Sequence, residues 1–259
     1  MKATQRREEI LRLASSGGET IVDELADRFG VTASTIRRDL ARLSQEGELA
    51  RTYGGAIAMH AREQPLSERS AEHHAAKAAI GAWAACQVHP GDVVLLDAGT
   101  TTAELARALR GHGPLTVATT GLTPLAAISG AEGIEVLCLG GRLREMSQGF
   151  VGPLTEASLE RLTFDAVFFG ADGVTAERGI CEANLEQTRL KELMWQHSRS
   201  TFVLAHGAKV GYAPFHAWMR MPAQWTLVTD DEASERQLAP FRANGIRVVV
   251  VDGTGTQVR

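Results

Sequence analysis

Seven short apolar runs along the chain constrain its fold more than any other feature. Each run has five or six residues, and the runs are 92–97, 115–119, 134–139, 165–170, 200–205, 225–229 and 246–251. Strands that are apolar almost throughout are buried on both faces, which is typical of a mainly parallel sheet covered by helices. Helical patterns at about 102–110, 122–129, 153–162, 184–198 and 232–243 separate the runs. The alternation predicts an α/β domain.

The first 57 residues have a different pattern and predict a small α+β domain. Apolar residues recur at helical spacing over 6–14, 22–29 and 33–44, and Gly30-Val31-Thr32 separates the last two segments, which predicts a helix-turn-helix. Residues 48–57 combine β-forming residues with a Gly-Gly pair, which predicts a short two-stranded wing. We therefore expect a winged helix-turn-helix domain at 1–57, a linker at 58–74 and an α/β domain at 75–259.

The third predicted helix has an apolar stripe and a polar outer face. Ile36, Leu40 and Leu43 stand at i, i+4 and i+7 and face inward, with Thr32 before them as the predicted N-cap. A helix in the major groove of DNA reads base edges with its outer face. The residues expected to contact DNA, on this helix and the wing, are Ser34, Thr35, Arg37, Arg38, Arg42, Arg51, Thr52, Tyr53 and Gly54.

Charge alone does not separate DNA binding from the alternative. The net charge is −4, and residues 1–60 carry as many basic as acidic side chains. A small helical domain with a solvated arginine face therefore explains the pattern equally well, because DNA binding requires a local basic face and not a basic chain.

The same residues resemble the DNA-binding signature of the DeoR family of bacterial regulators. The resemblance rests on residues 22–43, which include Thr-Ile-Arg-Arg-Asp-Leu, and on Arg-Thr-Tyr-Gly-Gly-Ala at 51–56. Tyr53 is the one departure, because histidine is commoner at that position. The resemblance implies that double-stranded operator DNA is a partner.

The loops that follow the predicted strands outline a second site. Residues 97–102, Asp-Ala-Gly-Thr-Thr-Thr, lie between a strand and a helix. Backbone N–H groups and hydroxyls at a helix N-terminus form an anion site, although an ordinary turn with threonine caps explains the same residues. Loops at 119–121, 140–141 and 170–173 converge with this one in an open α/β sheet, which predicts a pocket for a small polar anion. Cys181 and Glu182 are further candidates for its lining, although a buried cysteine is more often part of a core.

The α/β domain resembles the sensor domain of the DeoR family, which is similar in fold to ribose-5-phosphate isomerase and the coenzyme A transferases. The matching elements are the loop at 97–101, the glycines at 140–141, Gly-Ala-Asp-Gly at 170–173, residues 184–191 and residues 209–211. The resemblance implies a phosphorylated sugar or sugar-acid effector. The candidate effector-binding residues are Asp97, Ala98, Gly99, Thr100, Thr101, Thr102, Thr120, Gly121, Gly141, Asp172, Gly173, Lys191 and Lys209.

Two departures from the family pattern leave the identity of the effector open. Thr-Thr-Gly at 119–121 stands where Thr-Asn-Ser is common, and His206-Gly207 replaces the usual Asp-Ser.

Two other classes of protein compete with a regulator. Aligned from Asp172 and Lys191, the catalytic lysine and glutamate of the isomerase fall near Cys181 and Leu190, neither of which does the acid–base work that the isomerase requires, so we expect no enzyme activity. A sugar-phosphate isomerase or deaminase would turn over its substrate. A phosphosugar-binding module whose winged helix contacts protein would lack salt-dependent DNA affinity.

Several classes of site have no support in the sequence. There is no G-x-x-x-x-G-K-[ST] motif, and neither histidines nor cysteines show metal-ligand spacing, so we expect no cofactor and no metal. Cys86, Cys138 and Cys181 are far apart and are expected to be reduced. No apolar stretch suits a membrane span or a signal peptide, which predicts a cytoplasmic, nucleoid-associated protein with no membrane partner.

Together these features predict a bacterial transcription regulator. We expect a repressor of a carbohydrate catabolic operon, controlled by a phosphorylated sugar. One short helix reads few base pairs, so a homodimer or homotetramer is expected.

Overall fold

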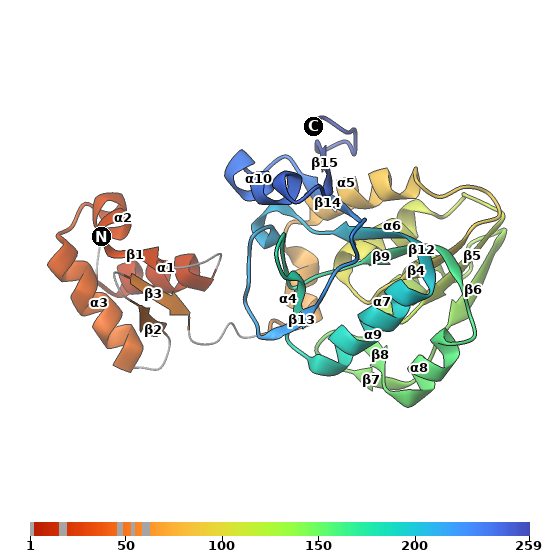
Figure 1. Cartoon of the computed structure of the whole chain (residues 1–259), viewed down its shortest axis with the longest axis horizontal. Helices are drawn as coiled ribbons and strands as arrows, with labels where there is room; N and C mark the ends of the chain where they lie inside the picture. The colour runs from red at the N-terminus through yellow and green to blue at the C-terminus, as the bar shows by residue number, and fades with distance from the viewer. Residues whose placement is uncertain (1–2, 16–19, 46–48, 53–54, 59–62) are drawn as a thin grey trace. The chain divides into compact units, whose positions relative to one another are not determined.

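The chain divides into two compact units (Figure 1). The computed structural model describes residues 3–15, 20–45, 49–52, 55–58 and 63–259. One unit comprises Met1–Arg62 with Tyr212–Phe215, and the other comprises Glu63–Gly211 with His216–Arg259. No helix in the described part of the chain is long and apolar enough to cross a membrane.

The first unit is a helix-turn-helix with a small sheet. Its described elements are α1 (Ala3–Ser15), β1 (Thr20–Ile21), α2 (Val22–Phe29), α3 (Ala33–Gln45), β2 (Leu49–Thr52) and β3 (Gly55–Ala58). The antiparallel order β1-β3-β2 contains the predicted wing and adds β1, whose two residues are too few to leave a pattern in the sequence.

Local residues set the ends of the two helices of the turn. Gly30 ends α2 in the left-handed conformation, at a φ of 61°, where glycine has no steric penalty. The Thr32 hydroxyl then accepts the backbone N–H of Thr35 at 3.3 Å, which confirms Thr32 as the N-cap of α3. Ile36 and Leu40 bury the inner face of α3 against the other helices.

The second unit is built on a seven-stranded sheet in the order β15-β14-β12-β9-β4-β5-β6. Every strand pair in this sheet is parallel, as predicted. The strands are β4 (Val93–Leu96), β5 (Leu115–Thr119), β6 (Ile134–Cys138), β9 (Phe164–Phe169), β12 (Ser198–Leu204), β14 (Thr226–Asp230) and β15 (Arg247–Val251). The helices between them are α6 (Thr100–Ala108), α7 (Leu122–Ile128), α8 (Pro153–Leu159), α9 (Leu185–Gln196) and α10 (Glu235–Ala243).

Helices cover both faces of this sheet because alternate strand residues point to opposite sides. On β4, Val94 and Leu96 pack in one apolar cluster with residues of α6 and of α5 (His74–Ala85). Leu95 packs in a second cluster with residues of α8, α9 and α10. The result is a three-layer α/β/α arrangement (Figure 1).

Short elements complete the second unit, and the sequence did not predict most of them. They are α4 (Leu66–Ala71), the hairpin β7 (Arg142–Arg144) with β8 (Gly149–Val151), the antiparallel sheet of β10 (Gly173–Thr175), β11 (Gly179–Glu182) and β13 (Ala217–Met219), and the 3-10 turn η1 (Gly207–Lys209). Helix α4 falls within 58–74, where the sequence indicates a linker. Its six residues are too few for a helical period, but Leu66 is buried and fixes it to the second unit.

Candidate functional site

The outer face of α3 carries the polar residues that the sequence assigns to DNA contact. We define the α3 outer face as Ser34, Thr35, Arg37, Arg38 and Arg42; Thr35 is half-buried and the other four are exposed. The Ser34 and Thr35 hydroxyls both lie within 3.0 Å of the Thr32 hydroxyl. Arg51 and Thr52 fall in β2, whereas Tyr53 and Gly54 lie outside the described residues.

The α3 outer face is electrostatically positive because the acidic residue of the helix points inward. Asp39 is 8% exposed and accepts a hydrogen bond from Arg6 Nε of α1 at 2.7 Å. No described carboxylate forms an ion pair with Arg37 or Arg38. Two adjacent, exposed arginines, Arg37 and Arg38, suit phosphate oxygens and guanine edges.

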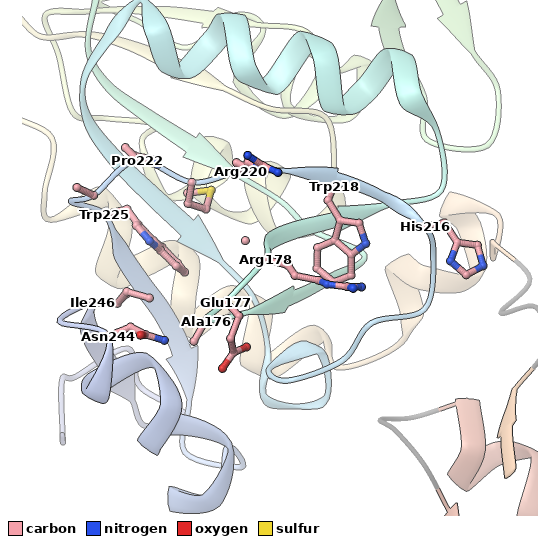
Figure 2. Close-up of a pocket in the computed structure, with 13 residues that line it drawn as sticks. Ala176, Glu177, Arg178, His216, Trp218, Arg220, Pro222, Trp225, Asn244 and Ile246 are labelled. Atoms are coloured by element: carbon pink, nitrogen blue, oxygen red, sulfur yellow. The ribbon is translucent and has the colours of Figure 1, made fainter. Parts of the chain in front are cut away.

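One hollow in the second unit contains none of the predicted site residues. Arg178, Trp218, Arg220 and Trp225 are among its lining residues, with the Arg178 guanidinium 5.2 Å from the Trp218 ring (Figure 2). Arg178 and Arg220 are exposed, and no buried side-chain atom that lacks a hydrogen bond in the described chain lines this hollow. The described residues of this hollow therefore do not form a polar binding site.

A smaller pocket lies where the sequence predicts one, in the loops after β4, β9 and β12. We call it the carboxyl-end pocket. Its predicted lining residues are Ala98, Gly99, Thr100, Thr101, Asp172 and Lys209. Glu182, a further candidate in the sequence, also lines it. The residues that sequence reasoning missed are Glu63, Arg69, Ser147 and Gln187; of these only Gln187 lies in an element that the sequence singled out, residues 184–191.

The N-terminus of α6 forms one wall of the carboxyl-end pocket. Gly99 is the N-cap, and Thr100 and Thr101 begin the helix, so backbone N–H groups without helical partners lie at this wall. Thr102, which the sequence predicts to line the pocket, does not line it. It is fully buried, and its hydroxyl donates to the Gly99 carbonyl at 3.1 Å, so it holds the turn and does not line the pocket.

A buried ion cluster lies beneath the carboxyl-end pocket. The Lys191 ammonium contacts the Asp97 carboxylate, lies 3.0 Å from Glu182 Oε1 and donates to the Gly170 carbonyl at 2.8 Å. Asp97 also accepts the Gly170 N–H at 3.1 Å. Asp97 and Lys191, both predicted to contact the effector, thus have partners inside the protein, and neither is among the residues that line the pocket.

Burial and charge set the ionisation of this cluster. Burial raises the pKa of Glu182 to about 8, and the ammonium of Lys191 only partly opposes that effect. Burial by itself would lower the pKa of Lys191, but the Asp97 and Glu182 carboxylates together raise it above its ordinary value. Lys191 therefore stays charged and anchors the underside of the pocket.

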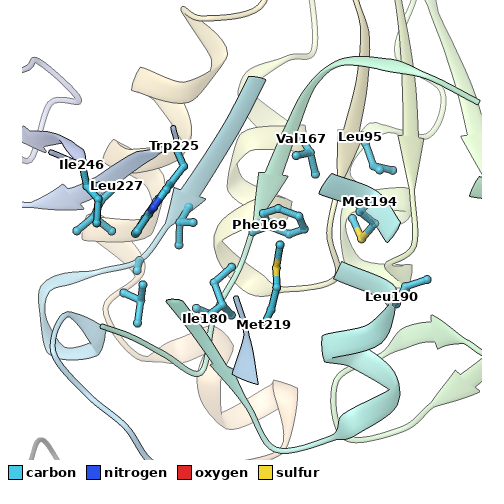
Figure 3. Close-up of a cluster of buried hydrophobic side chains, with 14 of the residues drawn as sticks. Leu95, Val167, Phe169, Ile180, Leu190, Met194, Met219, Trp225, Leu227 and Ile246 are labelled. Carbon is cyan, nitrogen blue, oxygen red and sulfur yellow. The ribbon is translucent and has the colours of Figure 1, made fainter. Parts of the chain in front are cut away.

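Apolar side chains hold α9, and with it Lys191, against the sheet. Leu190 and Met194 of α9 face Val167 and Phe169 of β9 in the apolar cluster (Figure 3). The Lys191 ammonium lies 5.5 Å from the centre of the Phe169 ring. Packing of Leu190 and Met194, which flank Lys191 on α9, thus fixes the position of the ion cluster.

The remaining predicted residues shape the loops without lining the pocket. A Cβ on Gly121 would lie 2.6 Å from Ala98 Cα, and Gly141, at a φ of 120°, faces the Thr155 hydroxyl too closely for any side chain. Gly173 pairs with β11 in the small sheet. Thr120 is 1% exposed, and its hydroxyl has no partner among the described residues.

Three buried polar atoms at the carboxyl-end pocket lack hydrogen bonds. They are Arg69 Nε, Ser147 Oγ and Gln187 Oε1, and the described residues offer none of them a partner. A buried polar atom without a partner costs about 1–3 kcal/mol. These three atoms therefore need partners that the described residues do not supply, and either water or a polar ligand can supply them.

Two basic side chains, Arg69 and Lys209, line the same pocket. The Lys209 ammonium donates to the Ala171 carbonyl at 2.5 Å, and burial lowers the pKa of Lys209. Burial, followed by the charge of Lys209, lowers the pKa of Lys77 to about 8. Arg69 pairs with Asp172, at 3.0 Å between Nη1 and Oδ1. Arg69 and Lys209 are therefore the basic side chains that an anionic ligand can meet in this pocket, beside the acidic Glu63, Asp172 and Glu182.

His206, just before η1, should make the second unit sensitive to acid. Burial lowers its pKa to about 2, helped by Lys209, and its ring stacks on that of His73 at 4.2 Å. The unfolded chain takes up a proton near pH 6.5 and the folded chain does not, so stability is lost as the pH falls below about 6.5, by up to about 1.4 kcal/mol per pH unit. In urea unfolding at pH 7.5, 6 and 5, the free energy of unfolding should fall less with pH for His206→Asn than for the wild type.

His216→Asn is the control for this acid sensitivity, because His216 is exposed. It should keep the pH dependence of the wild type. If His206→Asn kept the pH dependence of the wild type, His206 would not be the cause of the loss of stability in acid.

Comparison with known proteins identifies both units. The DeoR-like helix-turn-helix domain matches residues 6–62, and the DeoR C terminal sensor domain matches residues 72–231. The chain is 32% identical to a putative aga operon transcriptional repressor of Escherichia coli O157:H7, over 96% of this chain and 94% of that protein. It is also 32% identical to the regulator GlpR of Haloferax volcanii, over 98% and 99% of the two chains.

One more distant relative is also a transcriptional repressor, whereas the similarity to solved structures is too weak to bear on function. The glycerol-3-phosphate regulon repressor of Escherichia coli K12 is 28% identical over 82% of this chain and 84% of that protein. Among solved structures, ribose 5-phosphate isomerase A from Methanocaldococcus jannaschii has a TM-score of 0.38 at 17% identity, over 51% and 52% of the chains. That score is too low to decide anything about function. From the two domain matches and the full-length relatives, the chain belongs to the DeoR family of transcriptional regulators.

Proposed function

We propose that this regulator represses a carbohydrate operon as a homo-oligomer and that a phosphorylated sugar, bound in the carboxyl-end pocket, controls its affinity for DNA. The observation that carries this proposal is the group of three unpartnered buried polar atoms beside the α6 N-terminus and the cationic residues Arg69 and Lys209. The names of the relatives, an aga operon repressor and a glycerol-3-phosphate regulon repressor, support a sugar-derived effector.

The two kinds of polar group around the pocket match the two ends of such a molecule. The α6 N–H groups, Arg69 and Lys209 donate hydrogen bonds, which suits a phosphate or carboxylate. Gln187 Oε1 accepts only, and the Glu182 carboxyl also lines the pocket, so sugar hydroxyls suit this side. A polyhydroxylated anion satisfies both sides at once.

The alternative, an isomerase, has one observation in its favour. The Glu182 carboxyl lines the pocket with its pKa raised to about 8, as catalytic carboxylates often have. Against it, the Lys191 ammonium is held by Asp97 and Glu182 with its pKa raised, so it is a poor base. We infer that the protein is not an enzyme, and incubation with ribose 5-phosphate should give no product.

Arg37→Ala and Arg38→Ala should each weaken DNA binding. If each arginine makes a bidentate contact to a base, its loss costs about 1–3 kcal/mol, or about 5- to 150-fold in affinity. Duplexes selected by the wild-type protein from a random pool provide the ligand, and fluorescence anisotropy at two salt concentrations provides the measurement. The affinity of the wild type should fall steeply with salt.

The control is Arg236→Ala, which removes the same charge from an exposed position of α10 in the second unit. It should leave the affinity unchanged. Wild-type affinity in both α3 variants would exclude the α3 outer face as the reading surface, and the absence of any selected duplex would exclude sequence-specific binding.

The effector arm of the experiment repeats the titration with a phosphosugar panel. The panel comprises glycerol 3-phosphate, ribose 5-phosphate, glucosamine 6-phosphate, 6-phosphogluconate and inorganic phosphate. At least one organic member should raise the melting temperature and change the DNA affinity, because a ligand of the folded state stabilises it by mass action. No response to any member would overturn the proposed effector class and leave the DNA-binding result standing.

A further inference from the structure

The segment at 63–72 contributes directly to the wall of the carboxyl-end pocket. It follows residue 62, the last residue of the first unit's main segment, and contains α4. Glu63 and Arg69 both line the pocket. The chain that leaves the DNA-binding unit therefore becomes part of the candidate effector site before it enters the sheet.

Two ion pairs bind this segment to other parts of the second unit, the loop at Asp172 and the strand β7. Arg69 donates to Asp172 Oδ1 at 3.0 Å and to the Met146 carbonyl at 3.2 Å. Glu63 accepts from both guanidinium nitrogens of Arg144, with Nη1 at 2.6 Å from Oε1. The four side chains of these pairs are 10–17% exposed, so solvent weakens them less than it weakens surface pairs.

Lys77 fixes the end of α4 on the opposite side. Its ammonium donates to the Arg69 carbonyl and, at 2.7 Å, to the Glu72 carbonyl. Lys77 is 2% exposed, so this contact is internal. The backbone at Arg69 is thus held in place while its side chain reaches into the pocket.

One buried nitrogen of the Arg69 side chain has no hydrogen-bond partner among the described residues. Nη1 and Nη2 have partners, but Nε is buried and has none among the described residues. Asp172 has a second bond of its own, because it accepts the Ala183 N–H at 3.3 Å. Because Arg69 and Asp172 both line the pocket, an anion there would compete with Asp172 for the Arg69 guanidinium.

We propose that Arg69 binds the anionic group of the effector and that this contact, by releasing Arg69 from Asp172, shifts α4 and the chain that leads from it to the DNA-binding unit. The proposal rests on the function proposed above and adds the residue through which the site acts. Coupling requires that the effector bind one state of the protein more tightly than the other. Here the effector contacts Arg69 freely when the Arg69–Asp172 pair is broken and must compete with Asp172 when the pair is formed.

Two substitutions with opposite expected signs test this proposal. Arg69→Gln removes the anion contact and should raise the dissociation constant of the active panel member at least about tenfold. Asp172→Asn keeps an acceptor for the Ala183 N–H but removes the competing charge, so it should bind the same effector more tightly than the wild type. If the pair were only structural, both variants would weaken binding alike.

The readouts are the effector-dependent melting temperature and the DNA affinity with and without effector. At saturating effector, Arg69→Gln should no longer show the effector-induced change in DNA affinity. The control is Arg142→Gln, which breaks an exposed pair with Glu186 outside the pocket and should behave as the wild type. Arg69→Lys, which keeps the charge and lacks Nε, should bind with intermediate affinity.

The outcomes separate this proposal from the function on which it rests. If no panel member stabilises the wild type, the sugar-phosphate class is wrong and the role of Arg69 is overturned with it. If the wild type responds and Arg69→Gln responds equally, the effector class stands and only the role of Arg69 is overturned. Weaker binding by Asp172→Asn would also overturn it, even if Arg69→Gln failed to fold.

Discussion

Lys191→Met is expected to lower the free energy of unfolding of the second unit by about 3–5 kcal/mol. The substitution leaves the Asp97 carboxylate buried without its cation and removes the contact of Lys191 with the Glu182 carboxyl group. Both carboxylates lie within the protein at 3–4% exposure, so water cannot take the place of the ammonium. Urea unfolding followed by tryptophan fluorescence measures the loss, and all four tryptophans, at 83, 195, 218 and 225, lie in the second unit.

Two comparisons show whether the missing charge is the cause. Arg189→Met changes an exposed residue of the same helix and should shift stability by no more than about 0.5 kcal/mol. The triple variant Asp97→Asn, Glu182→Gln, Lys191→Met should recover part of the loss, because removal of a whole buried ion cluster costs less than removal of one partner. Equal stability of Lys191→Met and Arg189→Met would refute the structural role of the cluster.

Ile36→Ala is expected to unfold the first unit selectively. Ile36 is fully buried, and its truncation to alanine costs about 2–5 kcal/mol. A unit of this size has a total stability of about 3–9 kcal/mol at 0.05–0.15 kcal/mol per residue, so a large share is lost. DNA affinity should fall sharply, whereas the tryptophan-detected transition of the second unit should stay where it is.

The matched control is Ile21→Ala, because Ile21 is 44% exposed and loses little contact on truncation. It should bind DNA as the wild type does. A DNA affinity of Ile36→Ala equal to that of Ile21→Ala would show that this core residue is dispensable for the helix-turn-helix.

The sequence determined the elements whose pattern is local. The seven strands are readable because each is an uninterrupted apolar run, and the α3 outer face follows from the 3.6-residue spacing of Ile36, Leu40 and Leu43. The turn at Ala98–Thr101 is readable for the same reason, because the chemistry of a strand-to-helix turn lies within a few consecutive residues.

Only the tertiary structure decided which polar side chains line the pocket and which support it. Asp97 and Lys191, which the sequence offers as effector-binding residues, form an ion pair across 94 positions of sequence. Arg69 and Asp172, 103 positions apart, form a pair at the pocket although α4 left no readable period. An ion pair between distant residues leaves no periodic trace in the chain. A buried charged side chain can pair with another residue or bind a ligand. Which of the two it does depends on neighbouring side chains that only folding brings together.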